Sequence, residues 1–200
     1  MRFAIALLAA LLLASCATTY SLVEPARHTV RNVLSVEPGM KWNKMGSSGL
    51  QGNVEVWTLD GPALNTLVFF TGVNDGEPLL ASRAIGHKQE EKPPVFHSTM
   101  NPLEIQELMQ AAMARHFQST LAETHNLRTQ AVAETKGFRF QTRLVGRDEV
   151  ERHGVFAGAV SKGKLYGLWF QGAKLHYFDR YLPEYERILA SAKLIGPAAP

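Results

Sequence analysis

The sequence has a single cysteine, Cys16, among its 200 residues. One thiol excludes an intramolecular disulfide, a cysteine-based metal cluster and CxxC redox chemistry. Long apolar runs are also lacking: Phe3 to Leu13 has eleven residues, whereas a membrane-spanning helix needs about 20. Charge of one sign is scarce, because 21 cations face 18 anions. This balance indicates a mixed surface, and we expect no nucleic-acid partner.

Common catalytic motifs are missing as well. Gly46-Ser47-Ser48-Gly49 lacks the spacing of a G-x-S-x-G nucleophile elbow, and no P-loop or dinucleotide-binding fingerprint occurs. The best metal candidates are His87, Glu90, Glu91 and His97. Their irregular spacing and the adjacent Pro93-Pro94 favour a solvated loop over a zinc site. We therefore assign no catalytic residue, no metal ligand and no cofactor.

The N-terminus has the layout of an export signal. Arg2 precedes the apolar run, and the small residues Ala14 and Ser15 follow it. Leu13-Ala14-Ser15-Cys16 resembles the lipobox of bacterial lipoproteins. The resemblance implies diacylglycerol on the Cys16 sulfur, cleavage before Cys16 and acylation of the new amino terminus. Because Ala17 rather than aspartate follows the cysteine, it also implies the outer membrane of a Gram-negative cell, with the domain facing the periplasm.

The alternative is an ordinary secretory signal cut after Ala17, which would leave a soluble protein. On the lipoprotein interpretation, residues 1–15 are the signal peptide and residues 16–27, which include Pro25, are a tether. Residues 28–196 are expected to form a single globular domain, and residues 197–200 a disordered tail. The tether would hold the domain close to its membrane.

Several segments have strand patterns. Residues 53–59, 67–70 and 165–170 carry apolar residues on both faces, so each strand needs cover on both faces. Segments 155–160 and 165–170 flank Ser161-Lys162-Gly163-Lys164, a short glycine-containing loop that predicts a hairpin. The sheet is therefore expected to be antiparallel, at least in part. Trp42, Trp57 and Trp169 lie in or beside these patterns and are expected in the core.

Two amphipathic helices are predicted to supply the cover. The first starts with Asn101 as cap, Pro102 and Glu104, and runs to about Leu121, with His116 half-buried on its apolar face. The second begins near Leu182-Pro183 and presents Tyr185, Ile188, Leu189 and Ala192. The sheet needs cover on both faces, and the two amphipathic helices can provide it. Together they predict an α+β fold, in which an antiparallel sheet is sandwiched between helices.

Segment 138–145 alternates apolar and polar residues, which predicts a strand with a basic outer face. The basic residues of this strand and the segment after it are Arg139, Arg143, Arg147 and Arg152. They are a candidate contact surface for an anionic glycan, a lipid headgroup or an acidic protein. Alternatively, their charge discourages edge-to-edge aggregation of an exposed strand.

The segment from Gly163 to Leu194 is similar to the last strand pair and final helix of PsbP-like proteins. The matching features are the strand entry Gly163-Lys164-Leu165-Tyr166, a second strand ending near Tyr177-Phe178, and a helix ending Ile188-Leu189-Ala190-Ser191. The resemblance implies a PsbP-like α/β/α sandwich, and it implies a binding or assembly accessory. Its motifs describe packing, so no catalytic residue is carried over.

These observations predict a lipid-anchored envelope lipoprotein that is a non-catalytic binding or assembly accessory. Its partners would be the membrane, through the lipid on Cys16, and an envelope protein. Two alternatives stay open at this stage. One is an envelope hydrolase whose site assembles from distant segments, and the other is a carrier of an apolar ligand held between sheet and helix.

Overall fold

The computed structural model describes residues 20–46, 50–82 and 92–195. The main sheet within these residues has eight strands: β1 (Tyr20–Val23), β4 (Trp42–Met45), β6 (Val54–Thr58), β7 (Asn65–Val73), β9 (Leu121–Val132), β10 (Thr135–Val145), β11 (Glu151–Ser161) and β12 (Lys164–Ala173). Their order across the sheet is β1-β4-β6-β7-β12-β11-β10-β9, and all neighbours pair antiparallel. Strands β1 and β9 are therefore the two edges.

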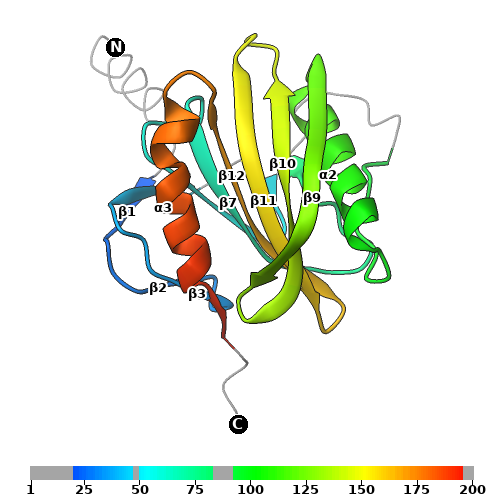
Figure 1. The fold of residues 1–200 in the computed structure, drawn as a ribbon, viewed down its shortest axis with the longest axis horizontal. Helices are drawn as coiled ribbons and strands as arrows, with labels where there is room; N and C mark the ends of the chain where they lie inside the picture. The colour runs from blue at the N-terminus through cyan, green and yellow to red at the C-terminus, as the bar shows by residue number, and fades with distance from the viewer. Residues whose placement is uncertain (1–19, 47–49, 83–91, 196–200) are drawn as a thin grey trace, which may run out of the picture.

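Helices α2 (Pro102–Phe117) and α3 (Tyr177–Ser191) lie on opposite faces of this sheet (Figure 1). Two small sheets complete the described part of the fold. They consist of β2 (His28–Val30), β3 (Leu34–Val36) and β13 (Lys193–Leu194), and of β5 (Leu50–Gln51) and β8 (Ala81–Ser82). The predicted α+β sandwich is confirmed. None of the helices in the described ranges is long and apolar enough to cross a membrane.

Each face of the sheet has its own apolar core. On the α3 side, Trp57, Phe69 and Phe170 pack with Tyr185 and Ile188 of the helix, and all five are fully buried. The core on the α2 side consists of a separate group of apolar side chains, which includes Phe70, Phe140, Phe156, Trp169, Ile105 and Met109. All nine residues of β7 are buried. The sequence prediction that this strand is covered on both faces is confirmed, as are the core positions of the three tryptophans.

The β11–β12 hairpin has the turn that the sequence predicts. Ser161 pairs with Lys164, and the two residues between them have left-handed backbone, with φ of 49° at Lys162 and 74° at Gly163. A two-residue turn with positive φ at both positions matches the twist of the flanking strands. Gly163 adopts this conformation without the steric cost that a side chain adds.

Helix α2 begins with the predicted capping box. The Asn101 Oδ1 atom accepts hydrogen bonds from the Leu103 and Glu104 amides at 2.9 and 3.1 Å, and Glu104 Oε2 accepts from the Asn101 amide at 2.7 Å. The predicted end near Leu121 is wrong, because the helix stops at Phe117. Gln118 turns left-handed with φ of 46°, and Leu121 is the first residue of β9.

Helix α3 begins at Tyr177, five residues before the predicted start, and β12 ends at Ala173. The expectation of a strand through Tyr177-Phe178 is therefore wrong. Phe178 stacks on Phe170 of β12 with 5.9 Å between ring centroids. Burial of this extra turn outweighs the cost of Pro183 inside the helix, which is about 3 kcal/mol in a helix interior.

The predicted tether extends into the sheet. Tyr20–Val23 form β1, which pairs with β4 in the register Tyr20 with Met45 and Val23 with Trp42. Val23 is 2% exposed and belongs to the α3-side core. Residues 16–27 were predicted to be a tether, but burial of Val23 stabilises residues 20–23 in the sheet. The first sheet residue, Tyr20, follows Cys16 by four positions.

A buried carboxylate on α3 fixes the segment that leads into β4. Glu184 Oε1 accepts hydrogen bonds from the Gly39 amide at 2.7 Å, the Met40 amide at 3.3 Å and Trp42 Nε1 at 3.4 Å. A Cβ atom on Gly39 would lie 2.8 Å from Glu184 Oε2 and 2.7 Å from Arg187 Cδ. A side chain at position 39 would therefore displace the Glu184 and Arg187 side chains from this contact.

We predict that Glu184→Ala lowers the free energy of unfolding by about 2–3 kcal/mol, because it leaves the buried Trp42 indole N–H and two part-buried backbone amides without their acceptor. Urea denaturation followed by tryptophan fluorescence measures the change. Glu184→Gln is the matched control, since it keeps one side-chain oxygen and should lose less than half as much. Equal losses in the two variants would show that the acceptor oxygen does not hold this segment.

Candidate functional site

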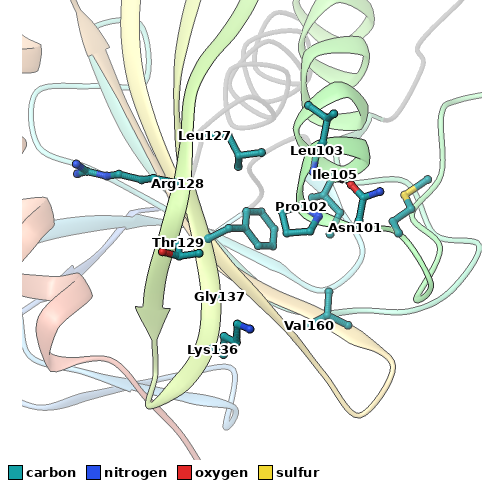
Figure 2. Close-up of a pocket in the computed structure, with 12 residues that line it drawn as sticks. Asn101, Pro102, Leu103, Ile105, Leu127, Arg128, Thr129, Lys136, Gly137 and Val160 are labelled. Carbon is teal, nitrogen blue, oxygen red and sulfur yellow. Dashed lines mark hydrogen bonds between the residues drawn. The ribbon is translucent and has the colours of Figure 1, made fainter.

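A groove lies between the N-terminal end of α2 and the hairpin formed by β9 and β10 (Figure 2). Its volume is about 600 Å³, within the range of about 300–1,000 Å³ that is usual for small-molecule sites. We call it the α2 groove. Its lining residues are Met100, Asn101, Pro102, Leu103, Ile105, Leu127, Arg128, Thr129, Lys136, Gly137, Phe138 and Val160.

The walls of the α2 groove are mainly apolar. Leu103 projects from the first turn of α2 and is 53% exposed, whereas Ile105 on the same helix is fully buried. Figure 2 shows Leu127 of β9 pointing toward α2. Phe138 of β10 is 4% exposed and belongs to the α2-side core. The groove therefore opens directly onto that core.

Positive charge is the only formal charge among the lining residues. Lys136 lies on the same face of β10 as Phe138, two positions away, so it shares the groove side of the strand. Arg128 is also a lining residue, but its side chain points away from the groove in Figure 2. None of the twelve lining residues is acidic. An apolar group that carries a negative charge would match this lining.

A second, more polar pocket of about 320 Å³ lies where β10, β11 and α3 meet. Glu151 is its central carboxylate. Glu151 Oε1 accepts a hydrogen bond from Arg143 Nε at 2.7 Å and lies 3.1 Å from His153 Nε2, and Oε2 accepts from Lys174 Nζ at 3.1 Å. Hydrogen bonds from Arg143, then His153 and Lys174, lower the pKa of Glu151 to about 2.

The ionisable groups of this polar pocket are engaged with one another. With its pKa near 2, Glu151 holds no proton to donate at neutral pH. Thr142 also lines the pocket, and its hydroxyl oxygen accepts a hydrogen bond from the buried Trp169 Nε1 at 3.2 Å. Among the described residues, no base forms a hydrogen bond with the Thr142 hydroxyl. The cluster instead links β10, β11 and the segment after β12.

The four arginines of the predicted basic face do not lie on one surface. Arg139 is 9% exposed, forms a two-pronged ion pair with Glu186 of α3, and lies 5.9 Å from the centre of the Tyr185 ring. The expected outward position of Arg139 is wrong, because α3 covers this side of β10. The Glu186 hydrogen bonds raise the pKa of Arg139, so the guanidinium stays protonated despite its burial.

Arg152 lies on the opposite face of the sheet from Arg143. Leu144 pairs with Arg152, and Arg143 pairs with His153, so the two arginines point to different sides. Arg152 is 7% exposed and donates to the Ala63 carbonyl and to Asp148. Arg143 belongs to the polar pocket and Arg147 is exposed in the β10–β11 connection. A partner contact at any of the four stays a prediction.

The remaining candidates have local roles or lie elsewhere. His97 Nδ1 is 3.5 Å from Asp75 Oδ2, while His87, Glu90, Glu91 and Cys16 lie outside the described residues. Asp75 and Gly76 form a turn after β7. His116 is half-buried, and burial lowers its pKa. In the ranges that the structure describes, no three His, Cys, Asp or Glu side chains are placed to hold a metal ion.

The fold can be compared with solved structures. It is similar to the cyanobacterial PsbP protein (CyanoP) from Synechocystis sp. PCC 6803, with a TM-score of 0.57 and 12% sequence identity over 91% of this chain and 96% of that one. The fold is PsbP-like. This confirms the fold implied by Gly163 to Leu194 and extends it to nearly the whole chain. At this identity the similarity concerns the fold alone.

A weaker similarity involves LpqN of Mycobacterium tuberculosis, a protein involved in cell envelope biogenesis. It has a TM-score of 0.36 and 6% identity over 92% of this chain and 88% of that one, which is too low to support an argument. No protein-family profile and no curated protein sequence matches the chain. Function therefore has to be argued from the site.

No local sequence pattern predicts the α2 groove. Its apolar residues come from the α2 entry, from β9, from β10 and from Val160 at the end of β11, so no single segment displays the pattern. The one available signal was Leu103, an apolar residue that lies off the buried stripe of its helix. A single exposed apolar residue is common on protein surfaces, so Leu103 alone could not predict the groove.

We predict that the polar pocket makes stability depend on acid pH. Glu151 has a pKa of about 2 in the fold and an ordinary value of 4.5. Its stabilising contribution is therefore complete above about pH 4.5 and is lost as the pH falls through about 2. In Glu151→Gln this contribution is absent at every pH. Urea midpoints of the wild type and the variant should differ at pH 7 and converge toward pH 2.

Glu149→Gln is the matched control, because Glu149 is exposed in the connection between the same strands. This variant should keep the pH dependence of the wild type. If the urea midpoints of Glu151→Gln and the wild type differ by the same amount from neutral to acid pH, the ion pairs around Glu151 do not contribute to the free energy of unfolding.

Proposed function

We propose that this protein is a lipid-anchored envelope lipoprotein, attached through Cys16 to the outer membrane and facing the periplasm, whose domain binds a ligand and catalyses no reaction. The α2 groove is the observation that carries the binding function. It has the volume of a ligand site, apolar walls and an opening beside the exposed Leu103. The lipobox residues Leu13 to Cys16 support the anchor.

The groove favours an amphiphile with an apolar chain and an anionic head. Leu103, Leu127 and Val160 provide apolar contact for the chain. Lys136 provides a positive charge, and no carboxylate in the lining opposes a negative head. No ion pair or hydrogen bond within the described residues engages the Lys136 side chain, so its charge is free to meet the ligand. The carrier function is thus the one that the groove supports.

The hydrolase alternative has less support. The convergent ionisable groups of the polar pocket are engaged with one another, and Glu151 is held ionised by three partners. A hydrolytic site needs a nucleophile within hydrogen-bond reach of a base. The polar pocket contains the Thr142 hydroxyl, which instead accepts from Trp169.

The anchor is tested with two variants of the full chain expressed in a Gram-negative bacterium. Cys16→Ser should abolish incorporation of radiolabelled palmitate and release the protein from the membrane fraction, because the acylated sulfur is lost. Ala17→Asp should keep the label and move the protein to the inner membrane. Retention of Cys16→Ser in the membrane fraction would contradict the lipoprotein assignment.

The groove is tested with the lipid-free Cys16→Ser chain and a fluorescent long-chain fatty acid. Leu103→Glu places a carboxylate at the groove and should weaken binding at least about tenfold, a loss of about 1.4 kcal/mol. Leu175→Glu is the control, because Leu175 is 85% exposed and is not a lining residue. Equal affinity of the Leu103→Glu variant and the wild type would remove the groove as the binding site.

The charge preference is tested separately. Lys136→Glu should weaken binding of the fatty acid and leave binding of a fluorescent fatty alcohol of equal length unchanged. The reason is that only the acid carries a negative head. Arg147→Glu makes the same charge change at an exposed position outside the groove and should affect neither ligand. If Lys136→Glu weakens binding of the acid and the alcohol equally, Lys136 does not act through its charge.

A further inference from the structure

Strand β1 has an unusual surface for the edge of a sheet. Its sequence, Tyr-Ser-Leu-Val, contains no charged residue, although soluble proteins commonly place charge or proline on edge strands to prevent aggregation. Tyr20 is 43% exposed and Leu22 is 57% exposed. The two side chains lie on the same face, because they are two positions apart in a strand.

This apolar surface continues onto the next strand. Tyr20 pairs with Met45, which is half-buried and packs against the α2-side core. We call Tyr20, Leu22 and Met45 the β1 patch. The patch lies on the α2 side of the sheet, but α2 itself packs on β9 and β10 at the opposite edge (Figure 1). The helix therefore leaves the patch uncovered.

The position of the patch in the chain limits its distance from the membrane. Four positions separate Tyr20 from Cys16, and a fully extended chain of that length reaches about 14 Å. With lipid on Cys16, the Tyr20 end of β1 cannot be farther than this from the bilayer surface. The nearby charges are already paired, Glu24 with Lys41 at 3.3 Å and Glu37 with Arg27 at 3.5 Å. The edge therefore presents little net charge to the headgroups.

We infer that the β1 patch lies in the headgroup region of the bilayer that holds the Cys16 lipid, so that the domain has a fixed orientation on its membrane. The inference rests on the lipid anchor of the proposed function. Tyrosine is favoured at this depth, since its ring is apolar and its hydroxyl is polar. Leu22 and Met45 add apolar contact below the headgroups.

The orientation has a consequence for the α2 groove. The groove adjoins β9 and β10, which are the last two strands of the sheet order that begins with β1. At about 4.8 Å between neighbouring strands, the groove is held roughly 30 Å from the patch. Contact of the β1 patch with the bilayer therefore leaves the groove outside the contact area.

The test uses the lipidated full chain in phosphatidylethanolamine and phosphatidylglycerol vesicles. Since the lipid occupies the thiol of Cys16, a single introduced cysteine is the only free thiol. Leu22→Cys carries an environment-sensitive fluorophore in the patch. Ala111→Cys is the matched control, at an exposed position of α2 beyond the groove residues. Circular dichroism verifies that both variants are folded.

We expect the label at position 22 to shift to shorter wavelength on vesicles and to be quenched several-fold more strongly by a lipid-borne nitroxide than the label at position 111. Equal quenching of the two labels, or a label at position 22 that stays in water, would overturn the inference. Mass spectrometry of the same samples separates the two proposals. Missing lipid on Cys16 contradicts the anchor, whereas a lipidated chain with an unquenched label contradicts the β1 patch alone.

Discussion

The fold depends on one constraint, which is that the central strands are apolar on both faces. All nine residues of β7 are buried, and β12 and β11 carry Trp169, Phe170 and Phe156 to alternate sides. Burial of each large apolar side chain contributes about 1.5–3 kcal/mol, so leaving either face open would cost more than a domain's net stability. Helices α2 and α3 must therefore cover opposite faces, and the PsbP-like sandwich follows.

The way in which the helices cover the sheet also determines where ligands can bind. On one side, α3 lies over β12 and reaches β10, where Glu186 captures Arg139, and its Glu184 fixes the entry to β4. This face is closed by packing and ion pairs. On the other side, α2 packs on β9 and β10, and a groove remains where its first turn diverges from the hairpin. The binding site is thus the part of the apolar surface that the second helix does not fill.

Local patterns in the sequence predicted the parts of the fold that depend on local chemistry. The capping box at Asn101 and the turn at Lys162-Gly163 were predicted correctly because their residues act on their immediate neighbours. The early start of α3, the strand at Tyr20–Val23 and the inward position of Arg139 were missed. Each of them depends on a partner in another secondary-structure element, namely Phe170, Trp42 and Glu186. The α2 groove was missed for the same reason, since distant segments form its walls.

The central claim is that the α2 groove receives an apolar chain with an anionic head. Its most direct test is a ¹H–¹⁵N NMR titration of the lipid-free full chain with a long-chain fatty acid. The account predicts saturable shifts concentrated at residues 100–103, 105, 127–129, 136–138 and 160, which line the groove. Saturable shifts that cluster elsewhere, or no shifts at a ligand concentration well above that needed by known fatty-acid carriers, would contradict it.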